Sequence, residues 1–170
     1  GERGSMKKVM NLKSLLFCAM LVLTMSLNTV NAQAGALDYL GHTIDGSELT
    51  NEMESIGNYQ SVARSTYLHQ GFVRITNNGG GYVGIGAGTE CNVTCGTVKL
   101  NVYLERSSGS EDFYSYKKWE NVDYNTSSLY LNQQVKVEKG YYYRLRGYHS
   151  CTKNGVLENG ASRTDGIYIG

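Results

Sequence analysis

The stretch Val98-Lys99-Leu100-Asn101-Val102-Tyr103-Leu104-Glu105 decides the fold of this chain. Apolar and polar side chains alternate along its whole length. Successive side chains of a β-strand point to opposite faces, so the four apolar residues share one face and the polar residues share the other. A strand with one apolar face packs that face against a core. The stretch therefore predicts a half-buried strand.

Further strand signals lie on both sides of this stretch. The segments are rich in Tyr, Val and Thr, and turn-forming residues such as Asn77-Asn78-Gly79-Gly80 separate them. They cover residues 72–76, 82–87, 113–119, 129–137, 141–150 and 166–169. Seven short strands predict an all-β domain over residues 71–170, built as an antiparallel two-sheet sandwich. It is immunoglobulin-like or fibronectin-like at most, because Trp119 lies too far from Cys95 for true immunoglobulin spacing.

Residues 35–70 have a different character, being polar and poorly patterned. Only Leu49, Met53 and Ile56 recur at helical spacing, which allows one or two turns of helix. A helix that short is marginal without packing. We expect this part to be a flexible or loosely docked N-terminal arm.

The segment before the arm has the layout of a secretory signal peptide. Three lysines between Met6 and residue 13 precede an almost wholly apolar run over residues 14–27, and Ala32-Gln33-Ala34 follows. The apolar run is shorter than the roughly 20 residues of a membrane-spanning helix. We expect cleavage after Ala34, or alternatively after Ala32. Residues 1–5 are interpreted as a cloning remnant or a misplaced start, so residues 1–34 are excluded from the fold.

Export determines the expected location and partners. Removal of residues 1–34 takes away four of 16 basic and one of 15 acidic residues, which leaves a formal charge of −2. Binding to nucleic acid or to an anionic membrane requires a strong positive field, which this charge does not provide. We therefore expect a secreted, extracellular protein with no nucleic-acid partner and no membrane association after cleavage.

Three cysteines remain after cleavage: Cys91, Cys95 and Cys151. An oxidising compartment favours one disulfide among them. If the strands alternate in direction, Cys95 precedes an odd strand and Cys151 follows an even one, so both lie at the same end of the sandwich. We predict a bridge from Cys151 to Cys91 or Cys95 and favour Cys95. A single Cys-x3-Cys pair without a second pair is a weak metal signal, so no metal site and no cofactor is expected.

Several motifs have a structural explanation rather than a catalytic one. Residues 79–84 spell G-x-G-x-x-G, but a β-alternating run follows where a dinucleotide site needs a helix, so a glycine-rich hairpin is favoured. His42, His69 and His149 lie in unrelated contexts, and none has a second ligand at metal-binding spacing. No nucleophile elbow is present. The sequence predicts no catalytic residues.

The segment over residues 141–150 carries the clearest surface signal. Tyr142, Arg144, Arg146 and Tyr148 share one face of the expected strand. Tyr and Arg are enriched in binding surfaces, where they offer contact area and bidentate hydrogen-bond donors. They are also common cross-strand pairs on any sheet face. These four residues are the candidate binding stripe, and a purely structural role remains the alternative.

Five stretches share a distinctive pattern, together with Trp119: residues 45–50, 98–106, 124–128, 140–149 and 164–169. In these stretches the sequence resembles a family of small, secreted, uncharacterised proteins of Gram-positive bacteria. The resemblance covers most of residues 45–170. It implies a bacterial source and a secreted β-domain, and it supplies no catalytic or ligand residues.

These features together favour a secreted, non-enzymatic binding or structural module. Its partner would be an extracellular polymer or protein, of a kind that the sequence does not identify. A small extracellular hydrolase and a bacteriocin-like effector are the alternatives. A deep cleft lined by two or more titratable groups would favour the hydrolase, whereas a flat aromatic and cationic face would favour the binding module.

Overall fold

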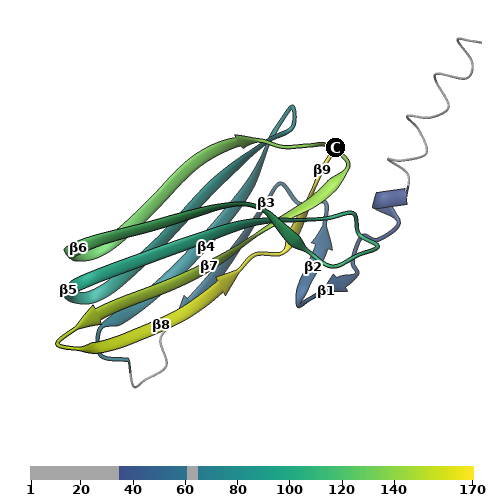
Figure 1. Ribbon diagram of the computed structural model, residues 1–170. Helices are drawn as coiled ribbons and strands as arrows, with labels where there is room; N and C mark the ends of the chain where they lie inside the picture. Colours follow the sequence, from purple (N-terminus) through teal and green to yellow (C-terminus); the bar gives the residue numbers. More distant parts are fainter. Residues whose placement is uncertain (1–34, 61–64) are drawn as a thin grey trace, which may run out of the picture. The chain divides into compact units, whose positions relative to one another are not determined.

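A 26-residue strand, β5 (Tyr82–Ser107), organises the fold in the computed structural model, which describes residues 35–60 and 65–170. The first half of β5 pairs with β4 (Leu68–Gly79), and its second half pairs with β7 (Tyr141–Lys153). Along its other edge, both halves pair with β6 (Tyr114–Lys136). All three pairings are antiparallel, and the four strands make up most of the sheet in Figure 1.

Shorter strands extend the sheet on both sides. β3 (Glu54–Gln60) pairs with β4, and β8 (Val156–Arg163) pairs with β7. β9 (Gly166–Ile169) pairs with β7 and, in parallel, with β2 (Ser47–Thr50). β1 (Thr43–Ile44) pairs with β2, so the main order is β1-β2-β9-β7-β5-β4-β3.

The all-β prediction is confirmed, but the two-sheet antiparallel sandwich is wrong. The strands form one mixed sheet that curls into a half-barrel. The predicted strands 82–87 and 98–105 are both parts of β5, and 113–119 and 129–137 both fall largely within β6. Two of the expected breaks are therefore continuous strand, which leaves fewer and longer strands at the centre of the sheet.

Irregularities inside the long strands replace the expected turns. The pairing of β5 with β6 shifts between Glu90 and Cys95, where residues 91–94 form a bulge. On β6, Asn125 has a positive φ of 52° within a segment that looks like a turn in the sequence. Bulges add twist and bend the strand that carries them. Along one edge, β5 pairs with β4 before its bulge and with β7 after it, and the sheet remains continuous.

The core lies on the face predicted from the alternating stretch. Val98, Leu100, Val102 and Leu104 are fully buried, as are their neighbours on β4, β7 and β9. The exception on the opposite, polar face is Glu105, which is only 2% exposed. A buried carboxylate needs a charged partner, and Arg144 of β7 provides one.

The N-terminal arm expected to be flexible or loosely docked is part of the sheet where the structure describes it. It contributes β1, β2, β3 and the first residues of β4. Leu49 of β2 is fully buried, and residues 36–170 form one compact unit. The three residues at helical spacing do not form a helix. Leu49 lies in β2, Met53 lies between the two strands, and Ile56 lies in β3.

The expected signal peptide lies outside the described residues. Within residues 35–60 and 65–170, helical structure is limited to one turn at residues 35–37. No helix in this part of the chain is long and apolar enough to cross a membrane.

Candidate binding groove

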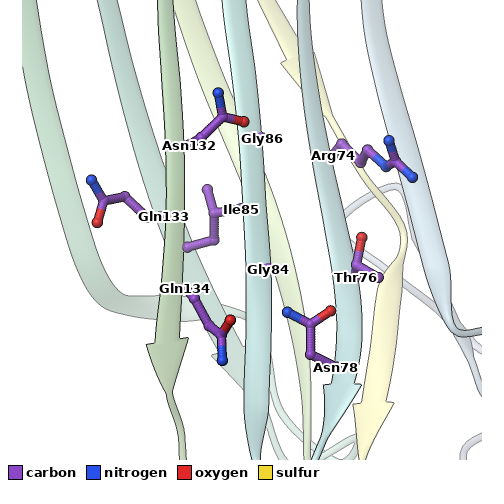
Figure 2. Close-up of a pocket in the computed structure, with 9 residues that line it drawn as sticks. All are labelled: Arg74, Thr76, Asn78, Gly84, Ile85, Gly86, Asn132, Gln133 and Gln134. Carbon is purple, nitrogen blue, oxygen red and sulfur yellow. The ribbon is translucent and has the colours of Figure 1, made fainter.

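An open groove of about 470 Å³ crosses the outer face of the sheet where β4, β5 and β6 run side by side. Figure 2 shows polar side chains of β4 and β6 on either side of two glycines of β5. The groove is lined by Arg74, Thr76, Asn78, Gly84, Ile85, Gly86, Asn132, Gln133 and Gln134. Amides and one guanidinium therefore dominate its polar groups.

Strand register places the lining residues in two rows across the sheet. The rows are Arg74–Gly86–Asn132 and Thr76–Gly84–Gln134. Each row has a glycine at its centre, so the middle strand forms a floor and the outer strands form walls. Adjacent strands are about 4.8 Å apart, which makes the trough about 10 Å wide, and successive rows lie about 7 Å apart.

Gly86 has no packing reason to be glycine. A Cβ atom added there would meet nothing closer than 3.7 Å, and its φ lies outside the left-handed region. At Gly84, an added Cβ would lie 3.0 Å from Nδ2 of Asn78, the movable end of an exposed side chain. Glycine in a strand weakens it and commonly marks a place where a ligand or another backbone approaches closely. The floor of the groove fits this description.

Aromatic residues lie at both ends of the glycine row. At one end, Phe72 and Tyr130 lie over Gly88 with ring centroids 6.4 Å apart. A Cβ atom at Gly88 would be 2.4 Å from the Phe72 ring, so this glycine, unlike Gly86, is required by packing. At the other end, Tyr82 is 38% exposed and Lys136 Nζ is 5.6 Å from its ring centroid.

The charged groups near the groove are held at its margin. Arg74 donates from Nε to Oε2 of Glu54 at 2.7 Å, and a second nitrogen of the guanidinium pairs with the same oxygen. Thr76 Oγ1 also donates to Glu54 Oε2, at 3.3 Å. Tyr130 donates to Glu90 Oε1 at 2.8 Å, and this hydrogen bond raises the pKa of Tyr130. The groove therefore carries little net charge.

The amide side chains of the groove are available to a ligand. Among the hydrogen bonds of the described residues, none engages the side-chain amide of Asn78, Asn132 or Gln134. Each amide offers two donors and one acceptor oxygen. Such a lining suits a neutral ligand that is rich in both donors and acceptors.

The candidate stripe on β7 is divided by the N-terminal strands. Tyr142 and Arg144 are buried, and the Tyr142 hydroxyl donates to the carbonyl of Ala36 at 2.7 Å. Arg146 keeps 37% of its side chain exposed, and Tyr148 is 42% exposed. The four residues share one face as expected, but half of that face is covered.

Arg144 is the centre of a buried polar cluster. Its Nε lies 2.8 Å from Glu105 Oε2, and its Nη2 lies 2.7 Å from Asp45 Oδ2. Ser47 Oγ accepts a third hydrogen bond, at 3.0 Å, and the guanidinium lies 4.2 Å from the centroid of the Phe113 ring. The hydrogen bond from Arg144, with the charge of that residue, lowers the pKa of Asp45. This cluster attaches the segment between β1 and β2 to β7.

The three cysteines meet beside the β5 bulge. The sulfur atoms of Cys91, Cys95 and Cys151 all lie within 4.8 Å of one another. All three are free thiols, so the predicted disulfide from Cys151 is absent from the structure. Burial raises the pKa of Cys91 to about 11 and also raises that of Cys151, so these thiols are neutral near pH 7. Three converging sulfurs are the side chains best placed to hold a metal ion in the described part of the chain.

The start of β4 is tied to β8. Glu158 of β8 accepts hydrogen bonds from Ser65 Oγ and from the backbone amides of Thr66, Tyr67 and Leu68, at 2.7 to 2.8 Å. Burial opposes the ionised form, but these hydrogen bonds outweigh it and lower the pKa of Glu158 to about 2. The carboxylate is fully engaged in holding this segment.

Sequence reasoning missed the groove, although one signal was present. Gly84, Gly86 and Gly88 alternate with Val83, Ile85 and Ala87, so β5 has one apolar face and one face without side chains. That one-sided glycine row can be found by periodicity alone. Its polar walls cannot, because only strand register brings β4 and β6 to either side of it.

The chain belongs to a family of unknown function, DUF6147, whose model matches residues 39–166. A comparison with curated proteins gave no match.

Proposed function

We propose that this member of the DUF6147 family is an exported, non-enzymatic module that binds an extended, neutral glycan in the groove across β4, β5 and β6. The observation that carries the proposal is the glycine floor between amide walls. Sugar hydroxyls are both donors and acceptors, and so are the side-chain amides of Asn and Gln. The groove is shallow and open, which suits a chain that passes through it rather than a small enclosed ligand.

The aromatic residues extend this argument. A pyranose ring presents apolar C–H faces as well as hydroxyls. The rings of Phe72, Tyr130 and Tyr82 lie at the two ends of the glycine row, where they can contact such faces. Tyr combines a large apolar surface with a polar hydroxyl, a combination favoured in binding sites.

The groove lining favours binding over hydrolysis. Glycoside hydrolysis ordinarily uses two carboxyl groups on either side of the scissile bond. The residues lining the groove include no Asp or Glu, and the carboxylate of Glu54, beside the groove, is paired with Arg74. Export is part of the proposal and rests on the signal-peptide pattern. N-terminal sequencing of protein from culture medium should find Gly35 or Gln33 first, and a full-length, cell-bound chain would contradict it.

Co-sedimentation with insoluble polysaccharides tests glycan binding. Cellulose, chitin and purified peptidoglycan cover common linkages, and calorimetric titration with the matching soluble oligosaccharide gives Kd. Gly86→Val should raise Kd at least about tenfold, about 1.4 kcal/mol, because the new side chain fills the floor of the groove. The fold should be preserved, since an added Cβ has room there.

Gly96→Val is the matched control. It makes the same substitution in the same strand at an exposed site outside the groove, where a Cβ would lie 3.5 Å from the nearest atom. It should bind as the unmodified protein does. Equal binding by the Gly86→Val variant would disprove the groove assignment, and release of soluble sugar would favour a hydrolase instead.

A further inference from the structure

Three sulfur atoms from two strands lie together at the point where β5 changes partners. Cys91 and Cys95 are at the two ends of the β5 bulge, and Cys151 lies on β7 opposite Val98. In the flat alternation of a regular strand, the separation of Cys91 and Cys95 would span about 13 Å. The bulge brings their sulfurs within 4.8 Å of each other and of Cys151.

The spacing is close to that of a metal-thiolate site. Thiolates bind Zn²⁺ at about 2.3 Å, which places sulfurs around one ion about 4 Å apart. Because the sulfur–sulfur distances here are at most 4.8 Å, each would shorten by less than about 1 Å on metal binding. Side-chain rotation in a bulge can supply such a change.

The surroundings fit a thiophilic ion. Cys95 and Cys151 are 1% exposed, while Cys91 is half-buried. The walls are apolar and are formed by Leu68, Val98, Leu129, Tyr59 and Tyr67. Soft thiolate ligands in such a setting select Cu(I) and Zn²⁺ over Mg²⁺, Ca²⁺ or Mn²⁺, which prefer oxygen ligands.

Two neighbouring charged groups complete the environment. Lys153 donates from Nζ to the carbonyl of Thr94, inside the bulge, at 2.7 Å. Its positive charge offsets the negative charge that a thiolate site acquires. Glu158 is saturated by its hydrogen bonds to residues 65–68, so the donor set consists of sulfur alone.

We propose that Cys91, Cys95 and Cys151 form a three-thiolate site for a thiophilic d¹⁰ metal ion. Three sulfurs without a fourth side chain match Cu(I) directly. They match Zn²⁺ with a solvent ligand on the side of Cys91. The competing chemistry is a disulfide, which uses two of the sulfurs and leaves the third buried without a partner.

Metal titration of the full chain, reduced and kept under argon, tests the proposal. Zn²⁺ is titrated against a chromophoric chelator and Cu(I) against bicinchoninate, so that the two arms identify the preferred ion. One equivalent should bind and should raise the thermal midpoint. Cys151→Ser should abolish binding. Because this residue is buried and the variant could fail to fold, Cys91→Ser, at the half-buried position, provides the second measurement and should weaken binding at least about tenfold.

His42→Ala and His69→Ala are the controls, since both imidazoles are exposed and neither belongs to the sulfur cluster. Both variants should bind as the unmodified protein does. Failure of both ions to bind at one equivalent overturns the proposal, as does an unchanged affinity in the Cys91→Ser variant. Peptide mapping that finds Cys151 in a disulfide in most molecules isolated without reductant also overturns it, because the same sulfur cannot serve both purposes.

Discussion

Arg144 and Arg74 occupy equivalent positions in opposite parts of the sheet. Each lies on a long strand, points to the outer face, and pairs with a carboxylate on a neighbouring strand. Arg144 is 1% exposed and is surrounded by Glu105, Asp45 and Ser47. Arg74 keeps 53% of its side chain exposed and has Glu54 as its ion-pair partner.

The difference arises from what covers each arginine. β2 and the turn before it lie over the Arg144 end of the outer face, while no described strand covers the groove beside Arg74. A charge that loses its water must be fully paired, so Arg144 has become part of the scaffold. A charge that keeps its water remains available to a ligand. The same residue type on the same side of a strand is therefore structural in one place and a candidate for binding in the other.

Substitution of the two arginines should separate the two roles most clearly. Arg144→Met removes the ion pair between Arg144 and the buried carboxylate of Glu105. It should therefore lower the free energy of unfolding by about 3–5 kcal/mol. Arg74→Met breaks only an exposed pair and should cost less than about 1 kcal/mol. Urea denaturation at neutral pH measures both. Similar losses for the two variants would mean that burial does not distinguish these arginines.

The covered and open environments also differ for histidine. His149 is buried between Thr89 and Ser162, with Nδ1 2.9 Å from one hydroxyl and Nε2 2.7 Å from the other. Burial lowers the pKa of His149 to about 4, although a backbone hydrogen bond to Gly88 opposes the shift. The unfolded chain therefore takes up a proton before the folded protein does. The stabilisation is complete above pH 6.5 and is lost as the pH falls towards 4.

This linkage gives a measurable pH dependence. Between pH 6.5 and pH 4, His149 should remove up to about 3 kcal/mol from the free energy of unfolding. His149→Gln should flatten that part of the curve, whereas His42→Gln, at an exposed position, should leave it unchanged. Urea denaturation across this pH range gives the slopes. An unaltered slope in the His149→Gln variant would show that this imidazole is not held neutral by burial.

A smaller effect should distinguish the two kinds of glycine on β5. Gly88→Ala places a methyl group against the rings of Phe72 and Tyr130 and should cost about 1–3 kcal/mol by overpacking. Gly86→Ala has room for the methyl group and should leave stability unchanged or slightly raised. Thermal unfolding of the pair measures the difference. Equal destabilisation would imply that Gly86, too, is required by packing, and would remove the main argument for the groove.

Local pattern predicted several features that the structure confirms. The apolar row of the 98–105 stretch forms the core, and the Asn-Gly run after residue 76 ends β4 at a hairpin whose glycines have positive φ. Both signals concern neighbours in the sequence, where side-chain alternation and backbone freedom decide the outcome. The segment around Asn125 carries a similar turn signal, yet the structure places it inside β6. Pairing with β5 on both sides of Asn125 keeps it within the strand.

The β class and the core face can be predicted from the sequence, because both depend on side-chain alternation along one segment. Which polar residues are covered depends on the assembled sheet. The N-terminal strands bury Arg144, and strand register places amide walls beside Gly84 and Gly86. Strand direction already predicted that Cys151 lies beside Cys91 and Cys95, but the pairing shift at the β5 bulge decides that all three sulfurs converge. The solvent access of a side chain and the meeting of side chains from distant segments depend on several strands at once, and no single strand encodes them.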